Sequence, residues 1–133
     1  MYVTRDFLNH VFGNSDNHGR NISFLKFDGD IRFAPIYDFA PMKADPELVT
    51  RLFKWGNNCE TGGQINFAKV AQSLSVFCDP EELVLFLKQL AEKLSDLPAL
   101  LQHLNCPAEI LNFPAIGFHN IKKKLAEMGV YDG

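Results

Sequence analysis

The chain has 133 residues, of which 47% are hydrophobic and 22% charged, and a formal net charge of −3. This composition is typical of one globular domain with a substantial core, and it argues against a disordered or membrane-spanning chain. The largest basic run is Lys122-Lys123-Lys124, which is too small to indicate direct nucleic-acid binding and is predicted to be a solvated helix face.

No basic segment followed by a long apolar one begins the chain, so we expect no signal peptide, no membrane association and a cytoplasmic location. The longest apolar region, 83–104, is interrupted by charged side chains and is not expected to cross a bilayer. The three cysteines, Cys59, Cys78 and Cys106, have no CxxC spacing. That pattern favours reduced thiols over a disulfide framework or a structural zinc site.

Apolar residues recur at helical spacing from Thr4 to about Phe12, which predicts a helix packed on a core. Thr4 or Asp6 is its expected cap, and Gly13 is expected to end it. From Asn21 to Pro35 the pattern changes to two short apolar runs that flank Asp28-Gly29-Asp30. This second pattern predicts a β-hairpin with a Gly-containing turn.

Prolines 35, 41 and 46 predict an irregular stretch after the hairpin. Asp45-Pro46 resembles a helix start, with an expected short helix through Leu52 or Trp55. Residues 56–63 are rich in Gly and Asn and are predicted to form a polar loop.

The rest of the chain is predicted to be helical. Asn66 is expected to cap one helix, and Asp79-Pro80 begins the clearest helix signal in the sequence. Its leucine stripe, at positions 83, 87, 90 and 94, is expected to face the core rather than to form a zipper. Two more helices are expected, over 98–103 and from about Ala115 to Met128. The predicted fold is therefore mainly α, with one short hairpin.

The strongest chemical signal is an acid, an asparagine and a second acid. Asn21 follows Asp16 by five residues, and Asp38 follows Asn21 by 17 residues, across the predicted hairpin. Protein kinases use this arrangement for a catalytic base and two magnesium ligands. The hairpin would bring the two parts together, because it returns the chain to the point where it started.

These residue types suit phosphoryl transfer. A loop carboxylate, Asp16, would orient the attacking hydroxyl and accept its proton. Mg²⁺ takes oxygen ligands, so the Asn21 amide and the Asp38 carboxylate suit it. Arg20 would approach the transferring phosphate, and His18 would hold the loop or contact the nucleotide.

A structural interpretation stays open at this point. Acids and asparagines beside glycine are common in turns, so an Asp-x₄-Asn pair also occurs without any catalytic role. The histidines outside the loop, His10, His103 and His119, are expected to be structural or surface residues.

The segment 13–24, Gly-Asn-Ser-Asp-Asn-His-Gly-Arg-Asn-Ile-Ser-Phe, and the later Ala-Pro-Ile-Tyr-Asp-Phe of 34–39 resemble the catalytic core of the HipA-like toxin kinases. The resemblance covers a G-x-[ST]-D-x-H-x-[KR]-N loop followed by P-x-Y-D. It implies a fold like a kinase C-lobe, in which the hairpin separates the catalytic loop from the metal-binding Asp. The implied catalytic residues are Asp16 and Arg20. The implied nucleotide and metal residues are His18, Gly19, Arg20, Asn21, Tyr37 and Asp38, with Asn21 and Asp38 on the metal.

The same resemblance implies a serine/threonine protein kinase of a bacterial toxin–antitoxin system that uses ATP and Mg²⁺. The implied partners are a DNA-binding, HipB-like antitoxin and a protein substrate such as an aminoacyl-tRNA synthetase. Nucleic acid and membrane are not expected as direct partners.

The sequence departs from the kinase pattern upstream of the loop. Only 15 residues precede Asp16, and no Gly-x-Gly-x-x-Gly occurs. We therefore expect residues 1–133 to be a single C-terminal lobe: an excised domain, a truncated product or one subunit of a split kinase. It would bind ATP weakly and be active only with an N-lobe, in the same protein or on a separate chain.

Two alternatives remain from the sequence. One is a non-catalytic remnant that binds an antitoxin or a kinase partner. The other is a metal-dependent hydrolase or nuclease that uses Asp16, His18 and Asp38.

Overall fold

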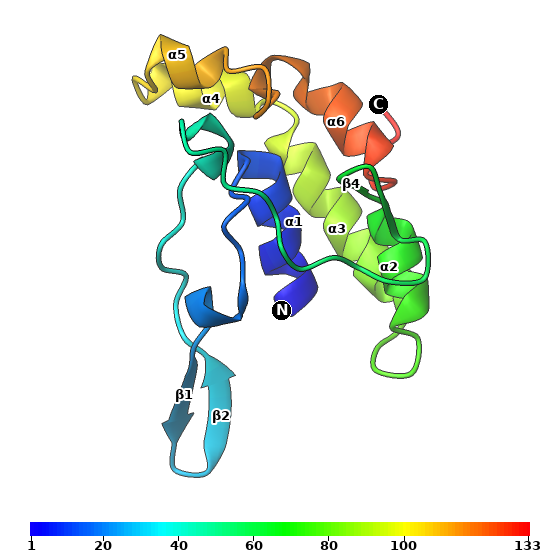
Figure 1. Cartoon of the computed structure of the whole chain (residues 1–133). Helices are drawn as coiled ribbons and strands as arrows, with labels where there is room; N and C mark the ends of the chain where they lie inside the picture. The colour runs from blue at the N-terminus through cyan, green and yellow to red at the C-terminus, as the bar shows by residue number, and fades with distance from the viewer.

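The computed structural model describes residues 1–133 and is about 45% helical, with two small antiparallel strand pairs. Its helices pack into one body, from which the first hairpin projects (Figure 1). The α-helices are α1 (Tyr2–Phe12), α2 (Phe67–Ser73), α3 (Pro80–Leu94), α4 (Leu97–His103), α5 (Ala108–Leu111) and α6 (Ile121–Glu127). The strands are β1 (Phe24–Phe27), β2 (Asp30–Phe33), β3 (Glu60–Thr61) and β4 (Gln64–Ile65). Short 3₁₀ turns are η1 (Gly19–Asn21), η2 (Met42–Ala44) and η3 (Phe118–Asn120). The expected mainly α fold is confirmed.

Helix α1 carries the apolar face that the sequence predicts. Phe7 and Val11 are fully buried, and the Phe7 ring meets Phe67 of α2 edge to face at 5.3 Å. Gly13 ends the helix with a φ of 71°, and a Cβ there would lie 3.1 Å from Ile116. The conformation and the close approach both favour glycine. The predicted caps were wrong, because the helix begins at Tyr2 and Asp6 is a buried residue within it.

The predicted β1–β2 hairpin is present. Phe24 pairs with Phe33 and Phe27 with Asp30 in an antiparallel ladder. Asp28 and Gly29 both have positive φ, 43° and 88°, as a two-residue hairpin turn of type I′ requires. One more bond extends the ladder past the ends of both strands, because the Ala34 N–H donates to the Ser23 carbonyl at 2.8 Å.

Two predicted helix caps are also present. The Asn66 side chain accepts from the backbone N–H of Lys69 at 3.0 Å, and Asp79 accepts from that of Glu81 at 2.9 Å. Each bond satisfies one of the orphan N–H groups of a first helical turn. Leu87, in the middle of the leucine stripe, is fully buried in the core. The stripe therefore packs the domain together, as expected.

The predicted helix from Asp45 towards Trp55 was wrong. Asp45 does accept a hydrogen bond from the Glu47 N–H, at 2.7 Å, but this closes only a turn. Leu48 then has a φ of 55°, which leaves helical space, and the chain continues without regular structure. Side chains of this segment bond to α1 instead, so tertiary interactions outweigh the local helix signal.

Three further features differ from what the sequence predicted. The expected polar loop over 56–63 contains strand β3, which pairs with β4. Helix α5 was not predicted. The last helix is shorter than expected, because Ile116 is buried and Gly117 has a φ of 79°, so the chain turns there before α6 begins.

The lysine run was predicted to be solvated, and this is wrong for one of its members. Lys122 and Lys123 are exposed on α6. The Lys124 ammonium turns inward and donates to the carbonyls of Val11, at 3.1 Å, and Ile116, at 2.8 Å. It thereby joins α6 to the end of α1. None of the helices combines the length and the apolar character that a membrane span requires.

One buried polar group on α1 makes stability depend on pH. Burial, followed by the charges of Lys124, Lys43 and Arg51, lowers the pKa of His10 from 6.5 to about 3. Between these values the unfolded chain binds a proton at His10 that the folded chain does not. The free energy of unfolding therefore decreases as pH falls through this window, by up to about 1.4 kcal/mol per pH unit.

Urea denaturation at a series of pH values between 7 and 4 measures this dependence. We expect a His10→Asn variant to lose less stability on acidification than the wild-type chain. A His119→Asn variant is the matched control, because His119 is exposed. Equal slopes for wild type and His10→Asn would contradict the assignment.

Candidate functional site

The loop that follows α1 alternates its side chains between the solvent and the interior. The Asp16 side chain is 33% exposed, whereas Asn17 is buried. The Asn17 amide donates to Asp6 at 2.9 Å, and Ser15 donates to the carbonyl of Val49 at 2.5 Å. Because its neighbours on both sides are anchored, Asp16 is presented outward from a fixed backbone.

His18 lies beside the Asp16 carboxylate. Its Nδ1 accepts from the backbone N–H of Arg20 at 3.1 Å, which in a neutral imidazole leaves the proton on Nε2. The Nε2 atom lies 3.4 Å from Asp16 Oδ1. His18 thus contacts both ends of the Asp16–Arg20 stretch, and both roles that the sequence left open for it stay predictions.

Asn21 and Tyr37 close the loop onto the segment that follows the hairpin. The Asn21 amide nitrogen donates to the backbone carbonyl of Asp16 at 2.8 Å, leaving its amide oxygen without a protein partner. The Tyr37 hydroxyl donates to the Arg20 carbonyl at 3.0 Å and lies 2.9 Å from the Ser23 hydroxyl. Two segments separated by the hairpin are therefore bonded side by side.

Asn21 and Asp38 line the same small cavity, of about 20 Å³. Asp38 occupies a sharp bend with a φ of 53°, a conformation that aspartate tolerates better than most residues. Tyr37 and Asn17 contribute to the same lining, and so does Arg5 of α1. The volume suits a single water molecule or a small ion.

The donor set fits Mg²⁺. Mg²⁺ in proteins is held by one or two carboxylates, retained waters and substrate phosphates, and here one carboxylate and one amide oxygen are available. No group of three or more His, Cys, Asp or Glu side chains is placed to hold a metal ion anywhere in the chain, this cavity and the trio Asp16, His18 and Asp38 included. The metal-dependent hydrolase that the sequence left open therefore gains no support from the side-chain arrangement.

A buried carboxylate that the sequence analysis missed organises the surroundings of the loop. Asp6 is fully buried and accepts four hydrogen bonds. Arg51 donates two of them, at 2.7 and 2.9 Å, Trp55 donates a third at 2.7 Å, and Asn17 donates the fourth. This saturates the acceptor sites of a carboxylate. Glu60 lies 3.5 Å from Arg51 and shares its charge.

Comparison with protein families matches residues 1–97 to the HipA-like C-terminal domain. The chain belongs to this family. This membership supports the resemblance to HipA-like toxin kinases that the loop motif indicated. Comparisons with curated proteins and with solved structures give no match.

Within this HipA-like C-terminal domain, the residues predicted for the site fall into two groups. Asp16 and His18 lie together on the loop surface, and Asn21, Tyr37 and Asp38 lie together at the small cavity. Gly19 and Arg20 are exposed in η1, and Arg20 forms no ion pair. The roles of these residues stay predictions. Asn17, Asp6 and Arg5 were not predicted, although a polar residue on the apolar face of a helix, such as Asp6, is a usable signal.

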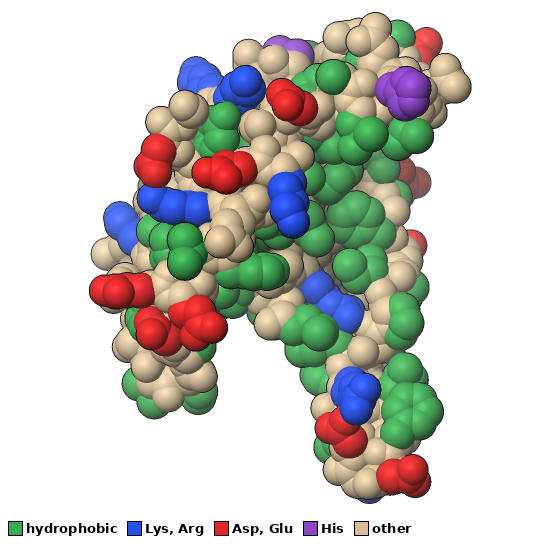
Figure 2. All heavy atoms as spheres, turned by 180° about the vertical axis from the view of Figure 1, so that it is seen from behind, with side chains coloured by type: hydrophobic (Ala, Val, Ile, Leu, Met, Phe, Trp, Pro, Cys, Tyr) green, Lys and Arg blue, Asp and Glu red, His purple; other side chains and the backbone are tan.

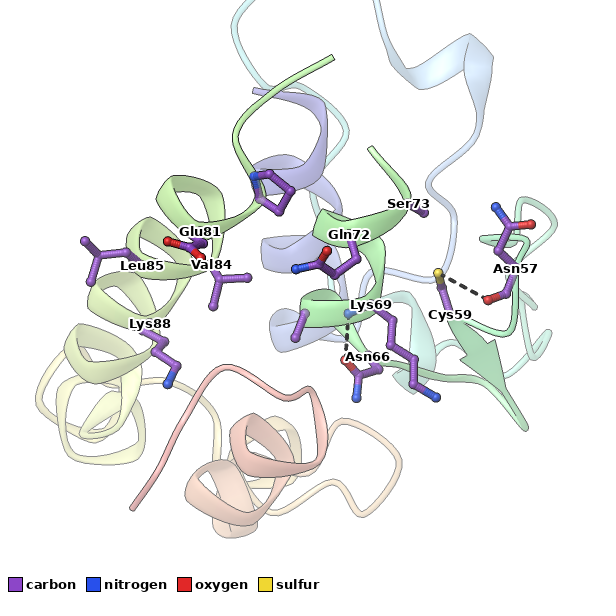
Figure 3. Close-up of a pocket in the computed structure, with 12 residues that line it drawn as sticks. Asn57, Cys59, Asn66, Lys69, Gln72, Ser73, Glu81, Val84, Leu85 and Lys88 are labelled. Atoms are coloured by element: carbon purple, nitrogen blue, oxygen red, sulfur yellow. Dashed lines mark hydrogen bonds between the residues drawn. The ribbon is translucent and has the colours of Figure 1, made fainter. Parts of the chain in front are cut away.

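A much larger cavity, of about 840 Å³, lies between α2 and the first turns of α3 (Figure 3). It shares no residue with the small cavity beside the loop. Two bonds fix part of its wall, the cap from Asn66 to Lys69 and a 3.8 Å contact from the Cys59 thiol to the Asn57 carbonyl. None of the predicted site residues lines this cavity.

The ion pair of Asp6 and Arg51 is expected to support the whole loop. An Arg51→Met substitution leaves a buried carboxylate without its main partner, which costs about 3–5 kcal/mol of unfolding free energy. An Arg32→Met substitution is the matched control, because Arg32 and its partner Asp30 are mostly exposed. That pair is worth at most about 1 kcal/mol. Chemical denaturation measures both, and a similarly small loss for the two variants would contradict the role given to Asp6.

Proposed function

We propose that this chain supplies the catalytic-loop half of a serine/threonine protein kinase site, which transfers the ATP γ-phosphate to a protein hydroxyl. The observation that carries the proposal is the common cavity of Asn21 and Asp38 beside the loop that presents Asp16. Membership of the HipA-like C-terminal domain family supports the same chemistry.

Asp16 is the proposed base. Its carboxylate is partly exposed and lies 3.4 Å from His18 Nε2, so it is accessible to a substrate, while the anchored neighbours Ser15 and Asn17 fix the backbone that carries it. It would accept the proton of the attacking serine or threonine hydroxyl, whose oxygen then bonds to the γ-phosphorus as ADP leaves. Because phosphoryl transfer depends mainly on positioning, a fixed loop is what this reaction needs.

Asn21 and Asp38 are the proposed holders of magnesium. When bound, Mg²⁺ would neutralise charge on the nucleotide phosphates. Asn21 is oriented for this role because its amide nitrogen is already bonded to the Asp16 carbonyl, which leaves the oxygen for the metal. Arg20 would contact the transferring phosphate, while Gly19, His18 and Tyr37 would shape the nucleotide site.

The other half of the site is proposed to come from a nucleotide-binding lobe, in the same protein or on a separate chain. The sequence holds no Gly-x-Gly-x-x-Gly, the pattern with which kinases cover the phosphates of ATP. By family, we propose a toxin–antitoxin role in the cytoplasm, restraint by a DNA-binding, HipB-like antitoxin, and a protein substrate such as an aminoacyl-tRNA synthetase.

A second candidate function is a non-catalytic binding module that engages an antitoxin or a kinase partner. The β1–β2 hairpin favours it, because Phe24, Phe27 and Ile31 are 61–64% exposed. Figure 2 shows hydrophobic side chains along this projecting arm. Exposed apolar groups of this kind are typical of surfaces that another protein covers.

The kinase proposal is tested by phosphate transfer. We expect the chain, mixed with a candidate N-lobe and labelled ATP, to label a protein substrate. An Asp16→Asn variant should reduce the rate by about 10²-fold or more, the range that a positioned base contributes. Asp30→Asn is the control, because Asp30 is an exposed acid at the end of the hairpin.

Two results separate the candidates. Transfer that does not depend on Asp16 would contradict the proposed base. Absence of any transfer, combined with partner binding in a pull-down that Asp16→Asn retains, would favour the binding module instead.

The proposed metal site also predicts how the isolated chain responds to Mg²⁺. Two protein oxygens alone hold the ion weakly, so Mg²⁺ without nucleotide should leave the melting temperature unchanged. Differential scanning fluorimetry with Mg²⁺, compared with Asp38→Asn under the same conditions, measures this. A clear rise in the wild-type melting temperature with metal alone would argue against a site completed by the triphosphate.

A further inference from the structure

A third cavity, of about 430 Å³, shares no residue with the small loop cavity, and its walls come from distant parts of the chain. His10 of α1 and Lys43 of η2 form part of the lining, together with the turn between β3 and β4. The turn before η3 and the side chains of Lys123 and Lys124 on α6 complete it. Its volume lies within the range of small-molecule sites.

Two lysines at this cavity have no carboxylate partner. Lys124 uses two of its N–H groups on the carbonyls of Val11 and Ile116, which leaves one donor. Lys43 forms no ion pair through its ammonium, although it is half-buried. Glu127, the one acid in the lining, contacts two other lining residues, Lys123 at 3.9 Å and Gln64 at 3.2 Å, and neither of the two lysines.

The positive charges are close enough to act on one another. Burial lowers the pKa of Lys124 from 10.5 to about 7, and the charge of Lys43 adds to that effect. Burial also lowers the pKa of Lys43, with a further contribution from Arg51. Arg51 is already neutralised by Asp6, so the uncompensated charge belongs to the two lysines.

Lysine side chains also line the cavity next to this one, near the loop that carries Asp16. A neighbouring cavity of about 420 Å³ shares His10 and Lys43 with this one. Its lining adds Ser15 and Lys54, and also Arg51 and Glu60, which pair with each other at 3.5 Å. Ammonium groups in a concave, partly dry surface concentrate positive potential where an anion can reach it.

We infer that the cavity between α1, η2 and α6 binds a small phosphate-bearing anion through the ammonium groups of Lys43 and Lys124. An anion there would offset two half-buried like charges that have no carboxylate partner. It would also accept the unused N–H of Lys124. Neither lysine belongs to the proposed nucleotide or metal residues, so this site is distinct from the kinase half-site.

Calorimetric titration of the folded chain with inorganic phosphate and with pyrophosphate tests the inference, at constant ionic strength maintained with chloride. We expect saturable binding to the wild type. Lys43→Gln should weaken the affinity about tenfold or more, since it removes a charge-assisted hydrogen bond to the anion. Lys43→Arg should retain most of it.

Lys122→Gln is the matched control, because Lys122 lies in the same lysine run but is exposed and outside the cavity. Circular dichroism checks that each variant is folded. Lack of saturable binding to the wild type, or equal affinity for Lys43→Gln and Lys122→Gln, would overturn the inference and leave Lys124 as a structural bridge only.

A pH series with sulfate adds an independent readout, because sulfate keeps its charge from pH 6 to pH 9. The charged and titratable groups around Lys124 are His10 on α1, Lys43 on η2, His119 on η3, and Lys123 and Glu127 on its own helix. Binding should be tighter at pH 6 than at pH 9, since Lys124 loses its proton around pH 7. Affinity that does not change with pH would contradict the participation of Lys124.

Discussion

The buried carboxylate of Asp6 is the constraint on which the arrangement of the loop depends. A charge with no exposed surface is costly to keep in the core unless its hydrogen-bonding capacity is filled. Helix α1 cannot fill it, because the helix backbone bonds to itself. The partners come instead from Asn17, Arg51 and Trp55, which are 11, 45 and 49 residues away. One side chain thus joins helix α1 to two segments without regular structure, the loop at Asn17 and residues 48–55.

This requirement explains two features that otherwise look unrelated. The segment 48–55 has no regular structure, although the helix-start signal Asp45-Pro46 comes just before it. A helix there would withdraw Arg51 and Trp55 from Asp6. The loop after α1 keeps its alternation of inward and outward side chains, because Asn17 is anchored to the same carboxylate. The outward position of Asp16 is therefore fixed from inside the core.

Local signals predicted a large part of the fold, and the failures share one cause. The hairpin turn at Asp28-Gly29 and the caps Asn66 and Asp79 were predictable, since each is a bond or a dihedral within a few residues. The extended stretch around Arg51 and the inward turn of Lys124 depend on contacts with α1, which no local pattern encodes. The family was predictable from the loop because the motif is contiguous apart from one hairpin. The cavity shared by Asn21 and Asp38 follows from that hairpin, whereas the Asp6 cluster behind it does not.

The β1–β2 hairpin has a consequence for how the length of this region can vary. Asn21 precedes one strand and Asp38 follows the other, so the ladder between the strands sets the separation of the two residues. Two residues added at the turn would lengthen the arm and leave the base in register. One residue inserted within a single strand would instead move every later side chain to the opposite face. Related chains should therefore differ in length at the tip of this hairpin, in steps of two, and keep its base constant.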